Sequence, residues 1–323
     1  MAGEKFVADV GGTNIRLAQV ENGRISVIKK YLCKDFETID DAILHFSKDI
    51  GVAQFSAGCI AIACPTNDDL VKMTNHSWVF SKSALKAHLG LEHLDVINDF
   101  TAVAHSLPNL THNQVIQIGS GHAAEHGNIA VFGPGTGLGV EHLTWTGNAW
   151  HTLDGEGGHV DFAPTEEDDL IIWRYLYKKF GRASAEEVLS GRGIVNIYSA
   201  FCEDAGKTPV FSEASQVTNA GLHHSDEFAH KAITQFCQIM GSFAGNLALN
   251  LCTTGGIFIG GGIVSRLQDF FLKSKFREKF EAKGDMAHYV KPIPTYLINE
   301  PDHGLLGALA YLLQQTQRTH NDE

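Results

Sequence analysis

Two glycine-rich turns decide the fold of this sequence: Asp9-Val10-Gly11-Gly12-Thr13-Asn14-Ile15-Arg16 and Gly133-Pro134-Gly135-Thr136-Gly137-Leu138-Gly139. Each turn follows a short apolar strand and leads directly into another strand, which is typical of a hairpin. Glycine permits positive φ and has no Cβ, and the successive amides of such a turn form a nest that favours anions. Two nests in one chain therefore indicate an enzyme that handles phosphate, with both turns acting on a polyphosphate.

Neither turn belongs to the common nucleotide-binding motifs. The second turn lacks the GxGxxG spacing before a helix, because residues 138–143 continue as a strand. The chain also contains no GxxxxGK[ST] sequence, which excludes a P-loop enzyme. Phosphate binding is therefore expected to depend on backbone amides, without a P-loop lysine.

Length and composition favour a two-domain α/β protein. The 323 residues suit two domains, and 44% apolar against 19% charged residues allow substantial cores. The formal net charge of −12 disfavours binding to nucleic acid or to an anionic membrane surface. It does not exclude a phosphate ligand, since the local amides and a bound Mg²⁺ set the potential at such a site.

The cysteines and the first residues predict a cytoplasmic protein. The six cysteines form no CxxC pair and are interpreted as reduced core thiols, not as disulfides or a zinc site. The sequence enters a strand soon after Met1, so no leader is expected, and no apolar run has the length of a membrane span.

The order of strand and helix signals predicts an internal repeat, because a strand–turn–strand unit occurs twice. In the first third, strands are predicted near 5–10, 14–20, 25–31, 57–63 and 94–98, with helices over 38–49 and 82–89. Further on, helices are predicted over 167–180, 185–190, 193–204, 227–251, 262–273 and 305–314, with strands over 256–259 and 294–298. Two related halves with a cleft between them follow, and such clefts favour ligand sites.

Two acidic positions lie at strand ends, where ligands of α/β sheets gather. Asp9 precedes the first turn and is predicted to hold Mg²⁺, directly or through water; the alternative is an ordinary turn aspartate. Asn98-Asp99 ends another apolar strand, where Asp99 can take a proton from an attacking hydroxyl. The alternative is that Asp99 only caps the helix that follows.

Two further segments carry polar side chains suited to a sugar. Glu156 and His159 lie in the glycine-rich stretch 155–161, where they can bond neighbouring hydroxyls unless the stretch is simply a solvated loop. Ser184 and Glu187 match the S-x-x-E capping box, which leaves Glu186 free to face the cleft.

A match to the H-x-x-E-H zinc motif at His122–His126 is discounted. That motif requires a helix that holds both imidazoles on one face, and here glycines flank a loop tip.

Taken together, the motifs resemble the bacterial glucokinase family, within the sugar kinases that share the hexokinase–actin fold. The resemblance covers nearly the whole chain and rests on the order of its motifs. These are residues 9–14, 59–65, 74–76 with Trp78, 97–102, 135–139, 155–162, 184–186 and 260–263. Pro134 departs from the pattern, because proline removes an N–H from the second turn. The cysteine-rich zinc motif and helix-turn-helix of the related repressor group do not occur.

The resemblance implies a two-domain hexokinase/actin-like (ribonuclease H-like) fold with a cleft that closes on glucose. It implies a small α/β domain of residues 1–108 and 302–323, a large α+β domain of residues 109–301, and a homodimer. It also implies ATP-dependent phosphorylation of D-glucose at the 6-hydroxyl, a step of glycolysis.

The resemblance also implies a role for each candidate residue. Asp99 would be the general base, and Asn98, Asp99, Glu156, His159 and Glu186 would bind the sugar hydroxyls. The ATP phosphates and Mg²⁺ would be bound by Asp9, Gly11, Gly12, Thr13, Asn14, Gly135, Thr136 and Gly137, with Gly260, Gly261 and Gly262 near the adenosine.

Two alternatives stay open at this point. One is a kinase for another sugar, such as fructose, mannose or an N-acetylhexosamine. The other is a sugar- or nucleotide-sensing regulatory protein without turnover, which Asp99 argues against because a binding protein needs no base there.

Overall fold

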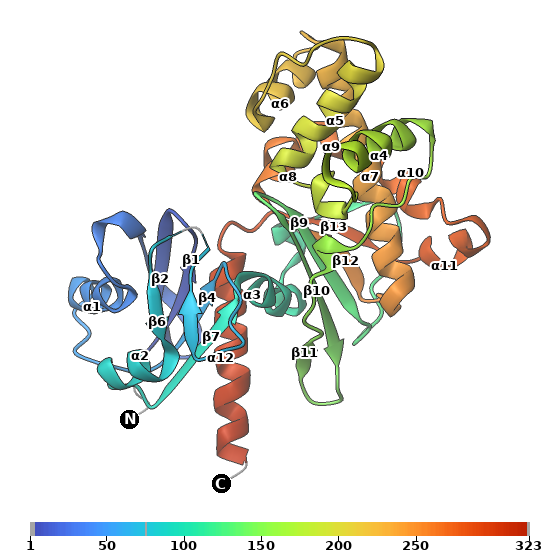
Figure 1. The fold of residues 1–323 in the computed structure, drawn as a ribbon. Coiled ribbons are helices and arrows are strands. Elements are labelled where there is room, and N and C mark those ends of the chain that lie inside the picture. The colour runs from blue at the N-terminus through green and yellow to red at the C-terminus, as the bar shows by residue number, and fades with distance from the viewer. Residues whose placement is uncertain (1–3, 75, 322–323) are drawn as a thin grey trace. The chain divides into compact units, whose positions relative to one another are not determined.

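The computed structural model describes residues 4–74 and 76–321, so Asn75, which belongs to one of the matching motifs, lies outside the described residues. The chain divides into two compact units. Unit 1 comprises Met1–Leu110 and Glu300–Glu323, and unit 2 comprises Thr111–Asn299. Each unit is built around one mixed β-sheet (Figure 1). In the described part of the chain, no helix combines the length and apolar character needed to span a membrane.

Unit 1 contains a five-stranded sheet in the order β3-β2-β1-β4-β7 and a separate pair, β5 and β6. Its strands are β1 (Glu4–Val10), β2 (Asn14–Glu21), β3 (Arg24–Leu32), β4 (Phe55–Ile62), β5 (Leu70–Lys72), β6 (Val79–Ser81) and β7 (His93–Asn98). Its α-helices are α1 (Ile39–Asp49), α2 (Lys82–His88), α3 (Asp99–Ser106) and α12 (His303–Asn321). The predicted strands and helices of this part of the chain are confirmed.

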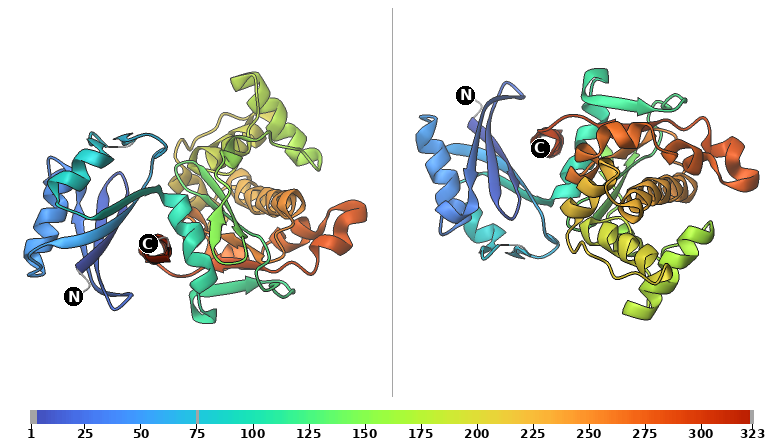
Figure 2. Two further views of the ribbon diagram at one scale, coloured as in Figure 1. Left: turned by 90° about the horizontal axis from the view of Figure 1, so that it is seen from below. Right: turned by 90° about the horizontal axis from the view of Figure 1, so that it is seen from above.

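Both faces of this sheet are buried. Alternate residues of a strand point to opposite faces, so Phe6 and Ala8 pack with α1 and α2, while Val7 packs with α3 and α12. Figures 1 and 2 show α1 and α12 on opposite sides of the sheet. A sheet covered on both faces explains why β4 is an uninterrupted apolar run.

The contact between α12 and α3 completes unit 1. A Cβ at Gly307 of α12 would lie 1.6 Å from the carbonyl oxygen of Ala102 in α3, so the two backbones approach closely only because residue 307 is glycine. Leu305 and Ala308 of the same helix are fully buried against the sheet. The last helix therefore packs on the first segment of the chain.

Unit 2 contains a six-stranded sheet in the order β11-β10-β9-β12-β13-β8. Its strands are β8 (Val115–Ile118), β9 (Ile129–Pro134), β10 (Leu138–Trp145), β11 (Trp150–Thr152), β12 (Gly256–Ile259) and β13 (Thr295–Ile298). Its α-helices are α4 (Glu167–Phe180), α5 (Gly191–Asp204), α6 (Ala214–Leu222), α7 (Glu227–Leu251), α8 (Gly262–Arg266), α9 (Gln268–Leu272), α10 (Phe276–Glu281) and α11 (Ala287–Val290).

The two sheets share one topology, which confirms the predicted internal repeat. In unit 1, β3, β2 and β1 are antiparallel neighbours, and β4 and β7 then pair parallel to β1 and to each other. In unit 2, β11, β10, β9, β12 and β13 follow the same order with the same directions. Strand β8 is an additional antiparallel edge.

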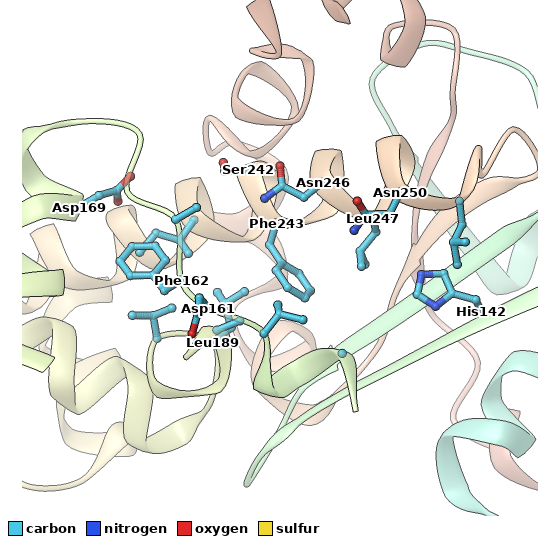
Figure 3. Close-up of a pocket in the computed structure, with 17 residues that line it drawn as sticks. His142, Asp161, Phe162, Asp169, Leu189, Ser242, Phe243, Asn246, Leu247 and Asn250 are labelled. Carbon is cyan, nitrogen blue, oxygen red and sulfur yellow. The ribbon is translucent and has the colours of Figure 1, made fainter. Parts of the chain in front are cut away.

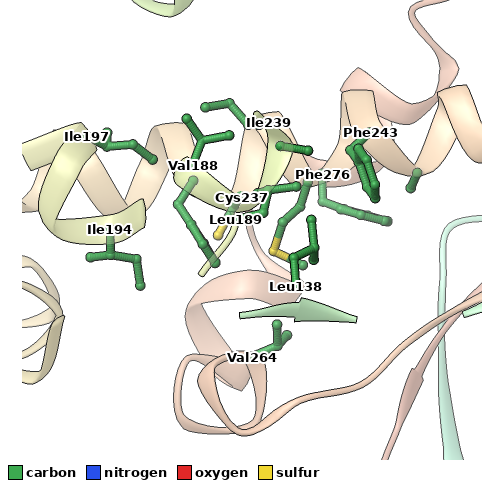
Figure 4. Packing of buried hydrophobic residues seen from close by; sticks show 14 of the residues in the cluster. Leu138, Val188, Leu189, Ile194, Ile197, Cys237, Ile239, Phe243, Val264 and Phe276 are labelled. Carbon is green, nitrogen blue, oxygen red and sulfur yellow. The ribbon is translucent and has the colours of Figure 1, made fainter. Parts of the chain in front are cut away.

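Helix α7 is the centre of the core of unit 2, where buried side chains of several helices surround it (Figure 4). Its Gly241 and Gly245 allow α10 to pack closely. A Cβ would lie 2.1 Å from the Phe276 carbonyl oxygen at Gly241 and 2.6 Å from the Phe280 carbonyl oxygen at Gly245. These two glycines therefore serve close helix packing.

The helix predictions in unit 2 need three corrections. The predicted helix over 185–190 is only a 3₁₀-helix at Ala185–Glu187. The predicted helix over 262–273 is two short helices, interrupted at Leu267, whose φ and ψ of −97° and 10° are not helical. Helices α6, α10 and α11 were not predicted, because short helices on a large core lack a clear 3.6-residue period.

We expect Gly307→Ala to destabilise unit 1, although alanine is normally the better helix former by about 1 kcal/mol. The added methyl would overlap the Ala102 backbone, and such overpacking typically costs about 1–3 kcal/mol. The measurement is chemical unfolding followed by circular dichroism. Gly155→Ala is the matched control, since a Cβ there meets nothing within 4 Å, and equal losses in the two variants would contradict the assignment.

Candidate active site

The first glycine turn joins β1 to β2. The Gly11 N–H donates to the Asn14 carbonyl oxygen at 2.9 Å, and the Cys33 N–H donates to the Thr13 carbonyl oxygen at 2.9 Å. The buried Cys33 thiol also donates to the Gly11 carbonyl oxygen at 3.4 Å. Cys33, the residue that follows β3, therefore fixes the turn through its N–H and its thiol.

Asp9 is half-buried beside this turn. Its Oδ2 lies 3.8 Å from Nη1 of Arg16, which faces it across the β1–β2 register. A Cβ at Gly304 would lie 3.0 Å from Asp9 Cγ, so glycine lets the start of α12 approach the carboxyl group. Burial raises the pKa of Asp9, while Arg16 and His303 oppose that shift.

Asn98 and Asp99 lie where β7 becomes α3. The Asn98 side chain is the helix cap, because its Oδ1 accepts the Phe100 N–H at 2.9 Å while its Nδ2 donates to the Cys64 carbonyl oxygen at 3.3 Å. Asp99 is the first residue of the helix, and its Oδ1 also accepts the Phe100 N–H, at 3.0 Å. The cap is therefore Asn98, and Asp99 adds a second acceptor for the same helix N–H.

The two aspartates lie at one edge of the sheet. Strands β1, β4 and β7 run parallel, and their register aligns Val10 with Ile62 and Ile62 with Asn98. Burial raises the pKa of Asp99 to about 6; the Phe100 N–H opposes the shift and the nearby charge of Asp9 adds to it. A carboxylate with that pKa can accept a proton near neutral pH.

The second turn, in unit 2, joins β9 to β10. The Gly135 N–H donates to the Gly137 carbonyl oxygen at 2.8 Å. A Cβ at Gly261, where φ is 92°, would lie 2.4 Å from the Pro134 carbonyl oxygen. The 260–262 segment can therefore contact this turn only because residue 261 is glycine. None of the glycines of either turn has positive φ, so the backbone conformation assumed for them is wrong.

Each turn nevertheless presents a pair of unused amides. Among the described residues, no acceptor bonds the N–H groups of Gly12, Thr13, Thr136 or Gly137. Thr13 and Thr136 are exposed, and the glycine beside each is half-buried. Adjacent amides of this kind bind anions, and the two turns offer the same pair at equivalent places of the repeat.

The segment with Glu156 and His159 lies against β10. A Cβ at Gly158 would lie 2.1 Å from the Leu138 carbonyl oxygen, so the segment is flat against the strand. Glu156 and His159 are exposed, and Arg182 donates to the His159 carbonyl oxygen at 2.8 Å. The segment is thus structured, with its two polar side chains directed to solvent.

Glu186 is not free, contrary to the capping-box prediction. Its Oε2 accepts the Leu138 N–H at 2.9 Å, and its Oε1 accepts a hydrogen bond from Arg192. The Ser184 side chain makes no capping bond, and the Glu187 carboxylate instead accepts from Asn196 at 3.0 Å. The box fails because the segment forms one 3₁₀ turn, and the next helix, α5, is capped by Ser190.

A cavity of about 360 Å³ lies within unit 2, behind these segments (Figure 3). Its walls come from residues 157–163, residues 185–189 and the face of α7 that carries Ser242, Asn246 and Asn250. The cavity therefore lies next to the segments that carry the candidate residues of this unit, but Glu156, His159 and Glu186 themselves do not line it.

The structure thus brings the predicted residues together in two groups. In unit 1, Asp9, the first turn, Asn98 and Asp99 share one sheet edge. In unit 2, the second turn contacts Glu186 and Gly261, and the 156–159 segment lies on the strand that follows the turn. Sequence reasoning missed Arg192, because nothing in the spacing of an arginine six residues after Glu186 indicates an ion pair.

Comparison with known proteins places this arrangement in a family. The sequence profile described as Glucokinase matches residues 6–315. The chain is 50% identical over 312 residues to a glucokinase of Photorhabdus laumondii, covering 96% of this chain and 97% of that protein. The chain belongs to the glucokinase family.

Solved structures agree with this membership. A glucokinase from an Antarctic psychrotroph superposes with a TM-score of 0.91 at 36% identity, covering 97% of this chain and 100% of the other. A ROK family glucokinase from Streptomyces griseus, solved with glucose and AMPPNP, has a TM-score of 0.62 at 18% identity, covering 97% and 100%. The latter likeness concerns the fold, and together they confirm the predicted hexokinase-like α/β class.

The donor set beside the first turn of this glucokinase-family chain fits Mg²⁺ held mainly by water and phosphate. Among residues 4–74 and 76–321, no group of three or more His, Cys, Asp or Glu side chains could hold a metal. Asp9 and Asp99 supply only hard carboxylate oxygens. Mg²⁺ commonly binds through one or two carboxylates together with substrate phosphates, which matches such a set.

We expect Ser184→Ala and Ser190→Ala to differ in their effect on stability. Ser190 is fully buried, accepts the Gly193 N–H at 3.1 Å and donates to the Glu186 carbonyl oxygen at 2.7 Å, so its loss should cost about 1–3 kcal/mol. Ser184 makes no capping bond, so its change should stay within about 0.5 kcal/mol. Urea unfolding measures the free energy of unfolding of both variants. A larger loss of stability from Ser184→Ala than from Ser190→Ala would support the capping box instead.

We expect Asp9→Asn to lower the pKa of Asp99, because it removes a like charge that raises it. The acid form of Asp99 should then lose its proton at a lower pH than the value of about 6 in the wild type. Carboxyl-carbon NMR titration measures the shift. Asp69→Asn, an exposed site of unit 1, is the control and should leave the titration of Asp99 unchanged; an equal shift there would refute the pairing.

Proposed function

We propose that this chain is a glucokinase that transfers the γ-phosphoryl group of ATP to the 6-hydroxyl of D-glucose. Asp99 removes the proton of the hydroxyl as it attacks phosphorus in line with the departing ADP. The observation that carries the proposal is Asp99 at a strand end with its pKa raised to about 6.

Asn98, Glu156, His159 and Glu186 are proposed to bind the sugar hydroxyls, together with Asp99. Carboxylates accept from hydroxyls, and amide and imidazole groups can donate or accept, so the set suits a polyhydroxylated ligand. The Asn98 amide is fixed by bonds to Phe100 and Cys64, which favours a single orientation toward the sugar. A hydroxyl in the wrong position leaves one of these groups unpaired, which selects among sugars.

The phosphates of ATP are proposed to bind the unused amides of the two turns, at Gly12, Thr13, Thr136 and Gly137. Gly11, Asn14 and Gly135 shape these turns through their own hydrogen bonds. Asp9 would hold Mg²⁺ through water, and the ion would neutralise charge on the transferring group. Gly260, Gly261 and Gly262, which follow β12, are proposed to lie near the adenosine.

Three wider predictions accompany this function. The units are proposed to act as the small and large domains of the enzyme, and the enzyme is proposed to be a homodimer in the cytoplasm. The six cysteines are free thiols and five are buried, which suits a reducing compartment.

We expect Asp99→Asn to lower the turnover number with glucose by at least about 10²-fold, because the amide cannot take a proton. In the wild type, kcat/KM for glucose should fall as the pH drops through about 6, since the base is active only when ionised. ADP release in a coupled assay measures both, and calorimetry measures glucose binding. Asp69→Asn, which is exposed and far along the chain from β7, is the matched control.

The wild type also decides among the alternatives. A panel of glucose, fructose, mannose and N-acetylglucosamine should give the highest kcat/KM with glucose. Glucose binding without ADP release would favour a sensor instead, and unchanged turnover in Asp99→Asn would reject the base.

A further inference from the structure

The carboxylate of Glu186 links two parts of unit 2. One oxygen accepts the Leu138 N–H, at the end of the second turn, and the other accepts from Arg192 near the start of α5. Only 13% of the Glu186 side chain is exposed, and a Cβ at Gly137 would lie 2.5 Å from its Oε2. The carboxylate is therefore in direct contact with the turn.

Among residues 4–74 and 76–321, the acidic partners of Arg192 are Glu186 and Glu187. Its Nη2 bonds Glu186 and lies 2.9 Å from Glu187 Oε1. Glu187 is itself fixed by Asn196, whose Nδ2 donates to both its carboxylate and its carbonyl oxygen at 3.0 Å. The Arg192 guanidinium thus links Glu186 to Glu187, whose position is fixed by Asn196.

The backbone strengthens the same link. The Gly191 N–H donates to the Gly135 carbonyl oxygen at 2.9 Å, and the Ser190 hydroxyl donates to the Glu186 carbonyl oxygen at 2.7 Å. A displacement of Glu186 is therefore transmitted to the turn through both its side chain and its main chain.

We propose that Arg192 is a positioning residue that couples sugar binding to nucleotide binding through Glu186. The inference rests on the proposed function, in which Glu186 binds a sugar hydroxyl and the turn binds phosphate. A carboxylate offers about four acceptor sites, and Leu138 and Arg192 occupy two of them, so a hydroxyl can bind without displacing either. A bound sugar then fixes the Glu186 carboxylate, and the fixed carboxylate orders the second glycine turn.

Charge supplies the second part of the coupling. Glu186 places its carboxylate next to Gly137, whose amide is proposed to bind phosphate together with that of Thr136, and Glu187 adds a second carboxylate that shares Arg192. Without Arg192, these carboxylates would repel the incoming phosphate and each other. Arg192 offsets that repulsion while leaving the amides open.

The test compares binding of a non-hydrolysable ATP analogue with and without saturating glucose. The ratio of the two Kd values is the coupling factor, and it must equal the factor for glucose measured with and without the analogue. We expect a wild-type factor of at least about 5, and a factor of about 1 in Arg192→Gln. Arg192→Lys keeps the charge and should recover part of the coupling.

Arg174→Gln is the matched control, because Arg174 is exposed on α4 and pairs with exposed Glu167; its factor should equal that of the wild type. Weaker glucose binding in Arg192→Gln with an unchanged factor would overturn the proposal, as would an uncoupled wild type that still phosphorylates glucose. A wild type without glucose-dependent ADP release fails the proposed function instead.

Thermal melting establishes that each variant folds. If Arg192→Gln does not fold, Glu187→Gln decides, because Glu187 is the fixed acid against which Arg192 holds Glu186, and the coupling factor should fall toward about 1. An unchanged factor in that variant would overturn the proposal.

Discussion

Close approach of neighbouring segments at glycine is the constraint on which both groups of functional residues depend. Gly304 lets α12 reach Asp9, Gly261 contacts the carbonyl of Pro134, and Gly158 lies on the carbonyl of Leu138. At each of these positions a methyl group would be 3.0 Å or less from a neighbouring atom. The polar side chains owe their positions to contacts that only the smallest residue permits.

The duplicated topology gives the two units the same hairpin, and each unit modifies it differently. Both hairpins present two adjacent amides without an acceptor, one pair beside Asp9 and the other beside Glu186. In unit 1 the nearby acids come from parallel strands of the sheet itself. In unit 2 the acid comes from a segment that enters from another part of the chain and is held by Arg192. The same hairpin backbone thus lies beside different acidic groups in the two units.

Local patterns in the sequence were sufficient for most strands, the hairpins and the acid at the end of β7, but not for the short strands β5, β6, β8 and β11. They were insufficient wherever a contact joins distant segments. The glycines of the turns were placed correctly but for the wrong reason, since none has positive φ and Gly137 instead makes room for a carboxylate 49 residues later. The capping box failed likewise, because Ser184 and Glu187 have the right spacing but no helix follows them directly. The mutual influence of Asp9 and Asp99 depends on the register of three strands, which spacing along the chain does not determine.

The position of α12 has a consequence for the order in which the protein can form on the ribosome. One face of the unit 1 sheet is covered by Leu305, Ala308 and Leu312, which are translated only after the whole of unit 2. Until they emerge, α3 covers only part of that apolar face, while unit 2 already has its entire core. Unit 2, the middle of the sequence, can therefore fold first during translation. The first segment of the chain, although it is made earliest, is among the last to reach its final packing.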